Sequence, residues 1–322
     1  MRILLIKTSS LGDVVHNLPV VTDLRREYPE ANIDWVVEES FADIARLHPG
    51  LRRVIPVALR RWRGALFAAA AWREMSAFRS TLREQGYNLV IDTQGLLKSA
   101  LITRMAQGRR CGYAASSARE PLASRFYDAT FEVPKSLHAV ERNRRLAAQA
   151  AGYTGSPTPD YGIAVPPAPS HQGIPLCITS ERATAVLLTA TSRDDKLWPE
   201  ERWIELGLRL RKNGLTCLLP AGNATERERA ARLALAIPDA VVLPPMSLTN
   251  LAAQLAAARI VIGVDTGLVH LAAALGRPTL ALFSASDPAL TGVLATTPAV
   301  NLGARGGPPG IDDATAAALS LL

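Results

Sequence analysis

The stretch VDTGLVHLAAALG, residues 264–276, has the composition of a phosphate-binding turn. An apolar run ends in Asp265, Thr266 and Gly267, and a helical pattern follows with His270 in its first turn. The first N–H groups of a helix lack intrahelical partners and attract anions, so this turn suits a pyrophosphate. Gly267 lets a phosphate approach the backbone, and Thr266 adds a hydroxyl donor. Helix capping by Asp265 or Thr266 is the alternative, but capping alone would require neither the glycine nor the histidine.

A second turn, residues 189–203 with the sequence TATSRDDKLWPEERW, has a similar arrangement. An apolar run ends in the hydroxyl residues Thr191 and Ser192, and Lys196 precedes a helix that starts near Pro199. A lysine in this position can meet a phosphate as a point charge. A solvated surface lysine is the alternative, and the sequence fits both interpretations.

A third turn, residues 218–230, carries Gly222 at the end of an apolar run and Glu226 near the start of the next helix. In dinucleotide-binding folds an acidic residue beyond a strand accepts hydrogen bonds from ribose hydroxyls. Glu226 is therefore a candidate ribose ligand. The helix dipole alone also favours an acid near a helix N-terminus, so both interpretations stay open.

The N-terminal turn, residues 7–21 with the sequence KTSSLGDVVHNLPVV, carries a candidate general base. Gly12 permits a tight turn after the first apolar run, and Asp13 opens the following helix. A carboxylate that faces a bound acceptor can take the proton of its attacking hydroxyl. The turn lacks the G-x-G-x-x-G spacing of dinucleotide-binding motifs. The alternative is an acid that only starts a helix.

Positive charge is concentrated in the first half of the chain. Residues 1–165 contain 23 Lys and Arg against 16 Asp and Glu, whereas the remainder contains 13 of each. Within residues 52–75, Arg60, Arg61 and Arg63 lie close in sequence to tryptophan and phenylalanine. This mixture favours contact with an anionic membrane surface, with a partly buried helix as the alternative. The concentrated charge predicts an anionic partner for the first half, with a solvated face that binds no partner as the alternative.

Alternating apolar runs and helical patterns position these turns and predict an α/β protein with two Rossmann-like domains facing across a cleft. The expected strands are residues 2–8, 32–38, 53–59, 88–94, 185–191, 215–221, 240–244, 259–265 and 278–284. Helical patterns cover residues 13–28, 69–85, 96–107 and 138–151 and start again near residues 199, 225, 247, 266 and 287. A Pro-, Gly- and Ser-rich linker at about 152–180 separates the expected domains, residues 1–160 and 161–322. Ligands of such sheets bind beyond the carboxyl ends of the strands, where all four turns lie.

Composition also bears on location and on cofactors. No run approaches the roughly 18–20 apolar residues of a membrane span, and the apolar N-terminus is too short for a signal sequence, so we expect a cytoplasmic protein. The chain contains no D-x-D triplet and no sequence cluster of histidines and acids. We therefore expect neither a metal site nor a cofactor. A pyrophosphate would then be neutralised by Lys196 and by helix N-termini.

Seven stretches of the chain, taken in order, resemble the lipopolysaccharide heptosyltransferases of glycosyltransferase family 9, which have the GT-B fold. The stretches are SSLGDVVHNLPVVTDL, VALRRWR, DTQGLLKSAL, SAREPLASRFY, HAVERNR, TSRDDKLWPEERW and GVDTGLVHLAAALG. SSLGDVVH and SAREPLASRFY are closer to the members that add the first heptose than to those that add the second. Ser192 stands where the family often has threonine, and the chain after Asp287 resembles the family poorly.

The resemblance implies an inverting transfer of L-glycero-D-manno-heptose from ADP-heptose to the inner Kdo of Kdo2-lipid A, at the cytoplasmic face of the inner membrane. It implies that Asp13 is the general base. The residues implied at the donor site are Thr191, Ser192, Lys196, Glu226, Met246, Asp265, Thr266, Gly267 and His270. Those implied for the carboxylates and phosphates of the acceptor are Lys7, Arg60, Arg61, Arg63, Arg119 and His138.

The sequence also leaves other functions open. A heptosyltransferase that adds the second heptose would share most of these motifs. A basic nucleic-acid-binding protein would fit the charged first half, but aromatic residues make up only 5% of the chain, few for base stacking. We therefore expect no nucleic acid partner. A nicotinamide dehydrogenase would require a G-x-G-x-x-G turn, which the chain lacks.

Overall fold

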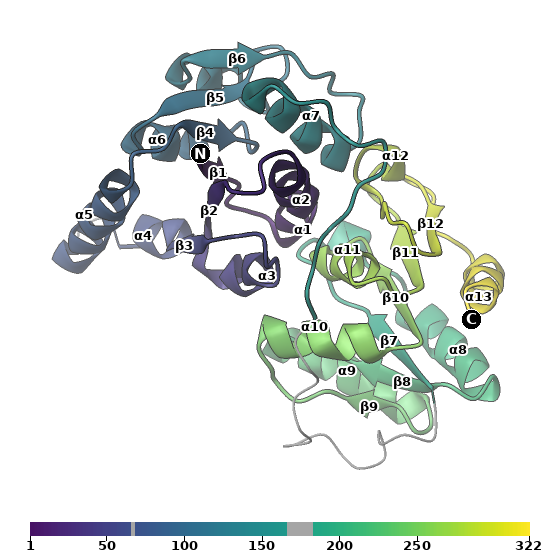
Figure 1. Ribbon diagram of the computed structural model, residues 1–322. Coiled ribbons are helices and arrows are strands. Elements are labelled where there is room, and N and C mark those ends of the chain that lie inside the picture. The colour runs from purple at the N-terminus through teal and green to yellow at the C-terminus, as the bar shows by residue number, and fades with distance from the viewer. Residues whose placement is uncertain (66–67, 166–182) are drawn as a thin grey trace. The chain divides into compact units, whose positions relative to one another are not determined.

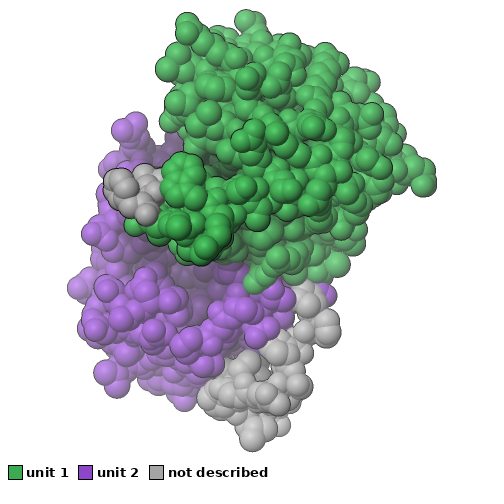
Figure 2. Space-filling model, turned by 90° about the vertical axis from the view of Figure 1, so that its left-hand side faces the viewer, with its two compact units in different colours: residues 1–164 green, residues 165–322 purple. Residues whose placement is uncertain are grey.

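The computed structural model describes residues 1–65, 68–165 and 183–322. The chain divides into two compact units, Met1–Ala164 and Val165–Leu322, called unit 1 and unit 2 below (Figures 1 and 2). The linker expected at about 152–180 falls in part on residues 166–182, which lie outside the described residues. None of the described helices is long and apolar enough to cross a membrane.

Unit 1 is built on a six-stranded parallel sheet with the order β3-β2-β1-β4-β5-β6 (Figure 1). Its strands are β1 (Arg2–Ile6), β2 (Asn32–Glu38), β3 (Arg53–Val57), β4 (Leu89–Asp92), β5 (Arg109–Tyr113) and β6 (Ala129–Phe131). Ile3 of β1 pairs with Ile33 on one side and with Leu89 on the other. The central strands are buried on both faces, as their unbroken apolar sequences predict. The four strands expected in this half are confirmed, whereas β5 and β6 were not predicted.

The helices of unit 1 include those expected over residues 69–85, 96–107 and 138–151, together with short helices that were not predicted. They are α1 (Leu11–Val15), α2 (Leu18–Glu27), α3 (Ala42–Arg46), α4 (Leu59–Arg63), α5 (Ala69–Glu84), α6 (Leu97–Met105) and α7 (Ala139–Ala151), with short 3₁₀ helices η1 (Glu39–Phe41) and η2 (Pro121–Phe126). The single helix expected over residues 13–28 is two helices. Pro19 lies in the first turn of α2 and explains the break, because it has no N–H to bond to the Val15 carbonyl oxygen and its ring would clash with that carbonyl in a continuous helix.

The strand order of unit 1 creates a crevice beside its two central strands. From β1 the chain passes to β2 on one side, whereas from β4 it passes to β5 on the other. Parallel sheets bind ligands at such a switch point, beyond the carboxyl ends of the strands. The residues that follow β1 and β4 are therefore the first place to look for a site in this unit.

Unit 2 repeats the same topology in a second six-stranded parallel sheet, with the order β12-β11-β10-β7-β8-β9. Its strands are β7 (Thr184–Leu188), β8 (Thr216–Leu219), β9 (Val241–Val242), β10 (Ile260–Val264), β11 (Thr279–Phe283) and β12 (Ala299–Gly303). The switch point here lies between β7 and β10. The five strands expected in this half are confirmed, and β12 was not predicted.

Helices complete unit 2 and bury a tryptophan pair. They are η4 (Asp194–Lys196), α8 (Glu200–Lys212), α9 (Ala224–Ala236), α10 (Leu248–Ala257), α11 (Gly267–Ala274), α12 (Pro288–Thr291) and α13 (Ile311–Ser320). The rings of Trp198 and Trp203 meet edge to face, with centroids 5.1 Å apart; such a pair contributes about 0.5–1.5 kcal/mol beyond its burial. Trp198 Nε1 donates to the Pro309 carbonyl oxygen at 3.0 Å. The chain after Asp287 thus packs onto the core of unit 2.

Candidate active site

The carboxyl ends of β7 and β10 bring Lys196, Asp265 and His270 together at the switch point of unit 2. Lys196 Nζ donates to Asp265 Oδ2 at 2.6 Å, and His270 Nε2 lies 3.7 Å from Asp265 Oδ1. The Thr191 hydroxyl donates to the Asp265 carbonyl oxygen at 3.1 Å. Four of the residues expected at a donor site therefore form one cluster, called the Asp265 cluster below.

Ser286, which was not predicted from the sequence, completes the Asp265 cluster. It lies just beyond β11, the neighbour of β10, and its hydroxyl donates to Asp265 Oδ2. Burial alone would raise the pKa of Asp265, but hydrogen bonds from His270, Lys196 and Ser286 hold that pKa well below its usual range. Asp265 is therefore ionised, and its charge offsets that of Lys196. The available signal was a hydroxyl residue two positions after the expected strand of residues 278–284.

The start of α11 leaves backbone donors for an anion. Thr266 is the N-cap residue of α11, and within the described parts of the chain its side chain makes no capping hydrogen bond. The Asp265 carboxylate is occupied by Lys196 and Ser286. The capping alternative therefore receives no support, and the N–H groups that begin at Gly267 suit a phosphate.

Glu226 is engaged by its own turn. Its carboxylate oxygens accept hydrogen bonds from Gly222 N at 2.7 Å and from Asn223 Nδ2 at 2.8 Å. Asn223 Oδ1 in turn accepts from Glu226 N at 2.9 Å. This is the geometry of an acid that starts a helix, although a carboxylate keeps further lone pairs that can accept from a ribose hydroxyl. Two other expected donor residues lie beyond the carboxyl ends of the same sheet but outside the Asp265 cluster. Ser192 is exposed after β7, and Met246 is half-buried after β9.

In unit 1, Asp13 lies at the centre of a second charged cluster. Ser10 N donates to Asp13 Oδ2 at 2.9 Å, as in a capping box. Arg119 Nη2 donates to Asp13 Oδ1 at 2.8 Å, and Lys7 Nζ lies 3.7 Å from the same oxygen. Asp13 therefore starts a helix and also contacts two of the residues expected to bind the acceptor.

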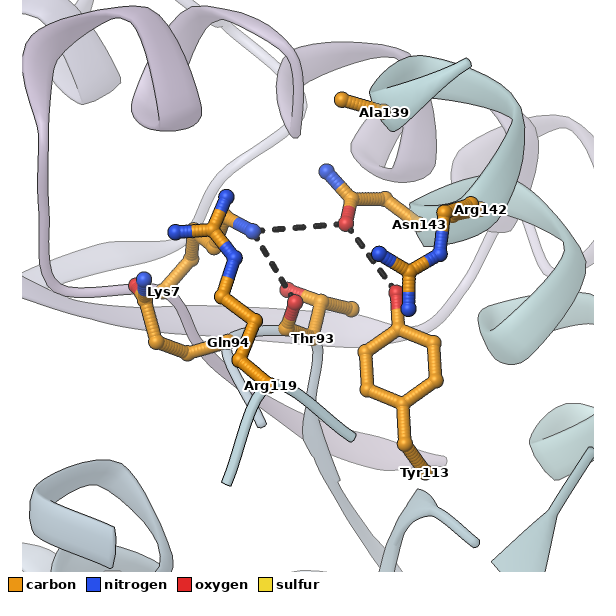
Figure 3. A pocket seen from close by; sticks show the side chains of 8 residues that line it. All are labelled: Lys7, Thr93, Gln94, Tyr113, Arg119, Ala139, Arg142 and Asn143. Carbon is orange, nitrogen blue, oxygen red and sulfur yellow. Dashed lines mark hydrogen bonds between the residues drawn. The ribbon is translucent and has the colours of Figure 1, made fainter. Parts of the chain in front are cut away.

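Lys7 and Arg119 line a small pocket at the carboxyl ends of β1 and β4, the switch point of unit 1 (Figure 3). Arg142 of α7 adds a third cation to its wall. Lys7 Nζ donates to the Thr93 carbonyl oxygen at 2.9 Å and to Asn143 Oδ1 at 3.4 Å. Lysine and arginine together suit a carboxylate or a phosphate. We call this site the cationic pocket.

Charges around the cationic pocket shift the pKa of both central groups. Burial lowers the pKa of Lys7 to about 8; Asp13 opposes this shift, whereas Arg119 and Arg142 add to it. Burial alone would raise the pKa of Asp13, but Lys7, Arg119 and the Ser10 N–H bring it below its usual value. Near neutral pH, Asp13 is therefore ionised and Lys7 is mostly protonated.

A buried turn after β4 holds the loop between β1 and α1. Gln94 Oε1 accepts hydrogen bonds from Thr8 N at 3.1 Å and from Ser9 N at 3.3 Å. Beneath this turn, Asp92 Oδ1 accepts from Gln94 N at 2.8 Å, and Tyr127 donates its hydroxyl to Asp92 Oδ2 at 2.8 Å. The roles of these residues were not predicted. Gln94 ended an expected strand and belongs to the DTQGLLKSAL stretch, and these were the signals that pointed to it.

His138 precedes α7, the helix that contributes Ala139, Arg142 and Asn143 to the cationic pocket. The His138 ring packs edge-on against His16 with centroids 5.6 Å apart. The His16 carbonyl oxygen accepts from Asn143 Nδ2 at 3.2 Å, so His138 adjoins the pocket but does not line it. Arg142 and Asn143 were missed, although both belong to the HAVERNR stretch.

The three arginines of α4 form a separate group. Helix α4 follows β3, which lies two strands from β1. Arg61 donates to Glu74 Oε2 at 2.7 Å and to Glu39 Oε2 at 3.1 Å, so two acids offset its charge. The Arg60 guanidinium lies 5.2 Å from the centroid of the Phe41 ring. Arg63 is exposed.

The fold and the two clusters define a class of protein. Each unit carries a parallel sheet of the same strand order, with a cluster of charged side chains at its switch point. The described residues contain no group of three His, Cys, Asp or Glu suited to a metal ion. This is the architecture of a GT-B type glycosyltransferase, which transfers a sugar from a nucleotide donor.

Comparisons with known proteins identify the family. The model of glycosyltransferase family 9 (heptosyltransferase) matches residues 75–309. Lipopolysaccharide heptosyltransferase 1 of Escherichia coli K12 is 48% identical over 294 residues, 91% of this chain and 90% of that protein. The structure of E. coli heptosyltransferase WaaC with ADP superposes with a TM-score of 0.91 at 42% identity and covers 100% of both chains. The structure with ADP-2-deoxy-2-fluoro heptose gives 0.85 at 43% identity, covering 99% of this chain and 98% of that one. The chain belongs to glycosyltransferase family 9, the heptosyltransferases.

Proposed function

We propose that this heptosyltransferase moves L-glycero-D-manno-heptose from ADP-heptose to the inner Kdo of Kdo2-lipid A, with inversion at the anomeric carbon. The observation that carries the proposal is the Asp265 cluster at the start of α11, in a chain 43% identical to an enzyme solved with an ADP-heptose analogue. The 48% identity to a lipopolysaccharide heptosyltransferase 1 supports the first heptose rather than the second.

The Asp265 cluster would hold the diphosphate of the donor. The N–H groups that begin α11 and the ammonium of Lys196 would meet the phosphate oxygens. Thr191, Ser192, Met246 and His270 would complete the donor site, and the spare lone pairs of Glu226 would accept from a ribose hydroxyl. No metal ion is required in this scheme, because helix N–H groups and Lys196 stabilise the charge on the departing ADP.

The cationic pocket would hold the acid groups of the acceptor. Lys7 and Arg119 would bind a Kdo carboxylate, with His138 beside them. Arg60, Arg61 and Arg63 of α4 would meet the lipid A phosphates. Because this acceptor is a membrane lipid, the enzyme would work as a peripheral protein at the cytoplasmic face of the inner membrane.

Asp13 would act as the general base in a single displacement. Its carboxylate would take the proton of the attacking Kdo hydroxyl as the oxygen bonds to the anomeric carbon. The bond between that carbon and the diphosphate oxygen would break on the opposite face, and the electron pair would leave with ADP. One base and one stabilised leaving group suffice for this reaction.

A transfer assay with defined acceptors tests the proposal. We expect heptose to pass from ADP-heptose to Kdo2-lipid A and not to an acceptor that already carries the first heptose. Transfer only to the heptosylated acceptor would identify an enzyme that adds the second heptose. Absence of transfer to both, together with a salt-dependent gel shift on DNA or RNA, would instead support nucleic acid binding.

A further inference from the structure

Three exposed leucines lie on α6 and η2 of unit 1, apart from the residues assigned to the reaction. Their exposed fractions are 36% for Leu97, 47% for Leu101 and 56% for Leu122. Leu97 and Leu101 are four residues apart on α6, so they lie on the same face of that helix. The opposite face of α6 is buried, with Ala100 and Ile102 in the core.

The leucines of the two elements belong to one surface. Helix α6 packs against η2, and the Leu97 backbone N–H donates to Glu120 Oε2 at 2.6 Å, two residues before Leu122. The remaining exposed position on the same face of α6 is Arg104. We call Leu97, Leu101 and Leu122 the leucine surface.

Cations flank the leucine surface. Arg104, Arg119 and Arg125 are exposed on the same two elements or directly before them, and Glu120 is the acid among them. Apolar side chains surrounded by arginines match the interface of an anionic bilayer, where leucines enter the acyl boundary and arginines meet the headgroups. Neighbouring leucines exposed to water do not stabilise a protein, and contiguous apolar patches often mark a contact surface.

The leucine surface adjoins the cationic pocket. Arg119, which lines the pocket, directly precedes Glu120 in the chain. The Gly95 carbonyl oxygen, in the turn that leads into α6, accepts from Glu120 N at 3.0 Å. A lipid whose sugar entered this pocket would therefore have its acyl chains close to α6 and η2.

We propose that the leucine surface rests on the anionic bilayer that carries the acceptor, with the leucines inserted at the headgroup boundary. The proposal rests on the proposed function for the identity of the lipid, and it assigns the membrane contact to α6 and η2. The arginines of α4 are not needed for the insertion itself.

Vesicle binding by a leucine variant tests the proposal directly. In Leu97→Gln/Leu101→Gln/Leu122→Gln, we expect co-sedimentation with phosphatidylglycerol-containing vesicles to fall by about tenfold or more, because the inserted apolar area is lost. Leu235→Gln is the matched control, because Leu235 is 89% exposed but lies in unit 2, and it should bind vesicles like the wild type. Vesicle binding that is unchanged in the triple variant would overturn the proposal.

Kinetics separate the membrane contact from the catalytic site. The triple variant should show a raised KM for Kdo2-lipid A embedded in vesicles and an unchanged KM for a soluble Kdo disaccharide acceptor that has no acyl chains. Equal losses with both acceptors would place the leucines in the sugar site and overturn the proposal. If the wild type transfers heptose to neither acceptor, the proposed function fails, but the vesicle assay still tests the leucine surface.

Two further measurements separate bilayer contact from misfolding and from self-association. If the triple variant does not fold, as judged by its thermal transition, Leu122→Gln and Arg104→Glu/Arg125→Glu replace it in the vesicle assay with the same expectation. The oligomeric state of the wild type is measured by light scattering. A dimer that the leucine variant converts to a monomer would show that a second copy covers this surface, and would overturn the proposal.

Discussion

At the scale of single residues, Asp13 is held in a way that keeps it ionised and also makes it a weak base. Arg119 and Lys7 lower its pKa, and a carboxylate of low pKa has little affinity for a proton. The acidic acceptor is attracted by the same two cations. When an acceptor carboxylate competes for Arg119, the arginine lowers the pKa of Asp13 less strongly. Because burial acts in the opposite direction, the pKa of Asp13 then rises. Acceptor binding would thereby strengthen the base that activates the acceptor.

The variant Asp13→Asn tests this role, since it keeps the shape of the side chain and removes the basic lone pair. We expect kcat to fall roughly 10²- to 10⁴-fold, the usual contribution of a general base. ADP binding should stay close to that of the wild type. Asp43→Asn is the control, because Asp43 is an exposed helix acid paired with Arg46. A near-normal kcat for Asp13→Asn would mean that Asp13 only starts α1.

Lys7 predicts a pH limit for acceptor use. Its pKa of about 8 lies within the accessible range, and it is protonated below that pKa and neutral above it. As pH rises through 8, the cationic pocket loses a positive charge, so kcat/KM for the acceptor should fall by up to about tenfold per pH unit. The KM for ADP-heptose should not follow. Lys7→Arg keeps the charge at every pH, so a decline that persists in this variant would assign the titration to another group.

At the scale of elements, the turn after β4 supports both the loop that precedes Asp13 and its ion-pair partner Arg119. Gln94 holds the loop that leads to α1, and the Gly95 carbonyl oxygen holds the backbone beside Arg119. The buried carboxylate of Asp92 organises this turn by accepting from Gln94 N and Gly95 N at 2.8 and 3.2 Å. Asp92 therefore acts by positioning Asp13.

In Asp92→Asn, an amide group replaces one acceptor oxygen of this buried network. We expect kcat/KM for the acceptor to fall about tenfold or more, since small displacements of a catalytic group are costly, while protection by ADP is retained. Tyr127→Phe, which removes only the hydroxyl donor to Asp92, should have a smaller effect in the same direction. Asp128→Asn serves as the exposed neighbouring control. If Asp92→Asn lost the thermal protection by ADP as well as acceptor turnover, the variant would be destabilised as a whole.

The elements that the sequence predicted are those with unbroken apolar runs. Central strands such as β1 and β10 are buried on both faces, so their sequences are apolar from Ile3 to Ile6 and from Ile260 to Val264. Strand β5 begins with two arginines, and β6 has three residues at the sheet edge. Arg109 is exposed and Arg110 half-buried at the start of β5, and β6 is too short, so neither strand produces a continuous apolar run.

Thr191, Lys196, Asp265 and His270 of the Asp265 cluster were singled out because the turns that carry them follow strands, whereas much of the cationic pocket was not. Lys7 and Asn143 meet across 136 positions of sequence, and Thr8 and Gln94 across 86. Such contacts depend on strand order, which decides that β4 lies beside β1. Local patterns do not carry that information, so Gln94, Arg142 and Asn143 became visible only in the structure.

At the scale of the whole molecule, two units of the same strand order differ in charge. The excess of basic residues lies in residues 1–165, whereas the second half is neutral. The same crevice position can thus serve an acidic lipid in one unit and a nucleotide in the other. Unit 1 would meet its ligand by long-range attraction, and unit 2 by the local donors of α11.

ADP should therefore stabilise the chain through unit 2. At about 100 times its Kd, ADP should add roughly 2.7 kcal/mol to the free energy of unfolding, measured as a raised thermal midpoint. GDP and UDP should protect much less if the site recognises adenine, and equal protection by all three would contradict that recognition. Lys196→Met should lose the protection, because it leaves the Asp265 carboxylate without the lysine that offsets its charge, whereas Lys7→Met should keep it.

The pairing of Lys196 with Asp265 has a consequence for turnover. The terminal phosphate of ADP has a second pKa of about 6, so free ADP carries one more negative charge at neutral pH than the same nucleotide linked to a sugar. A strongly cationic donor site would bind ADP more tightly than ADP-heptose, and slow release of ADP would then limit turnover. Because the lysine charge is offset by a carboxylate 2.6 Å away, the spent nucleotide gains little extra attraction. Product inhibition should accordingly be mild, and an inhibitor that mimics ADP alone would compete poorly with the intact donor.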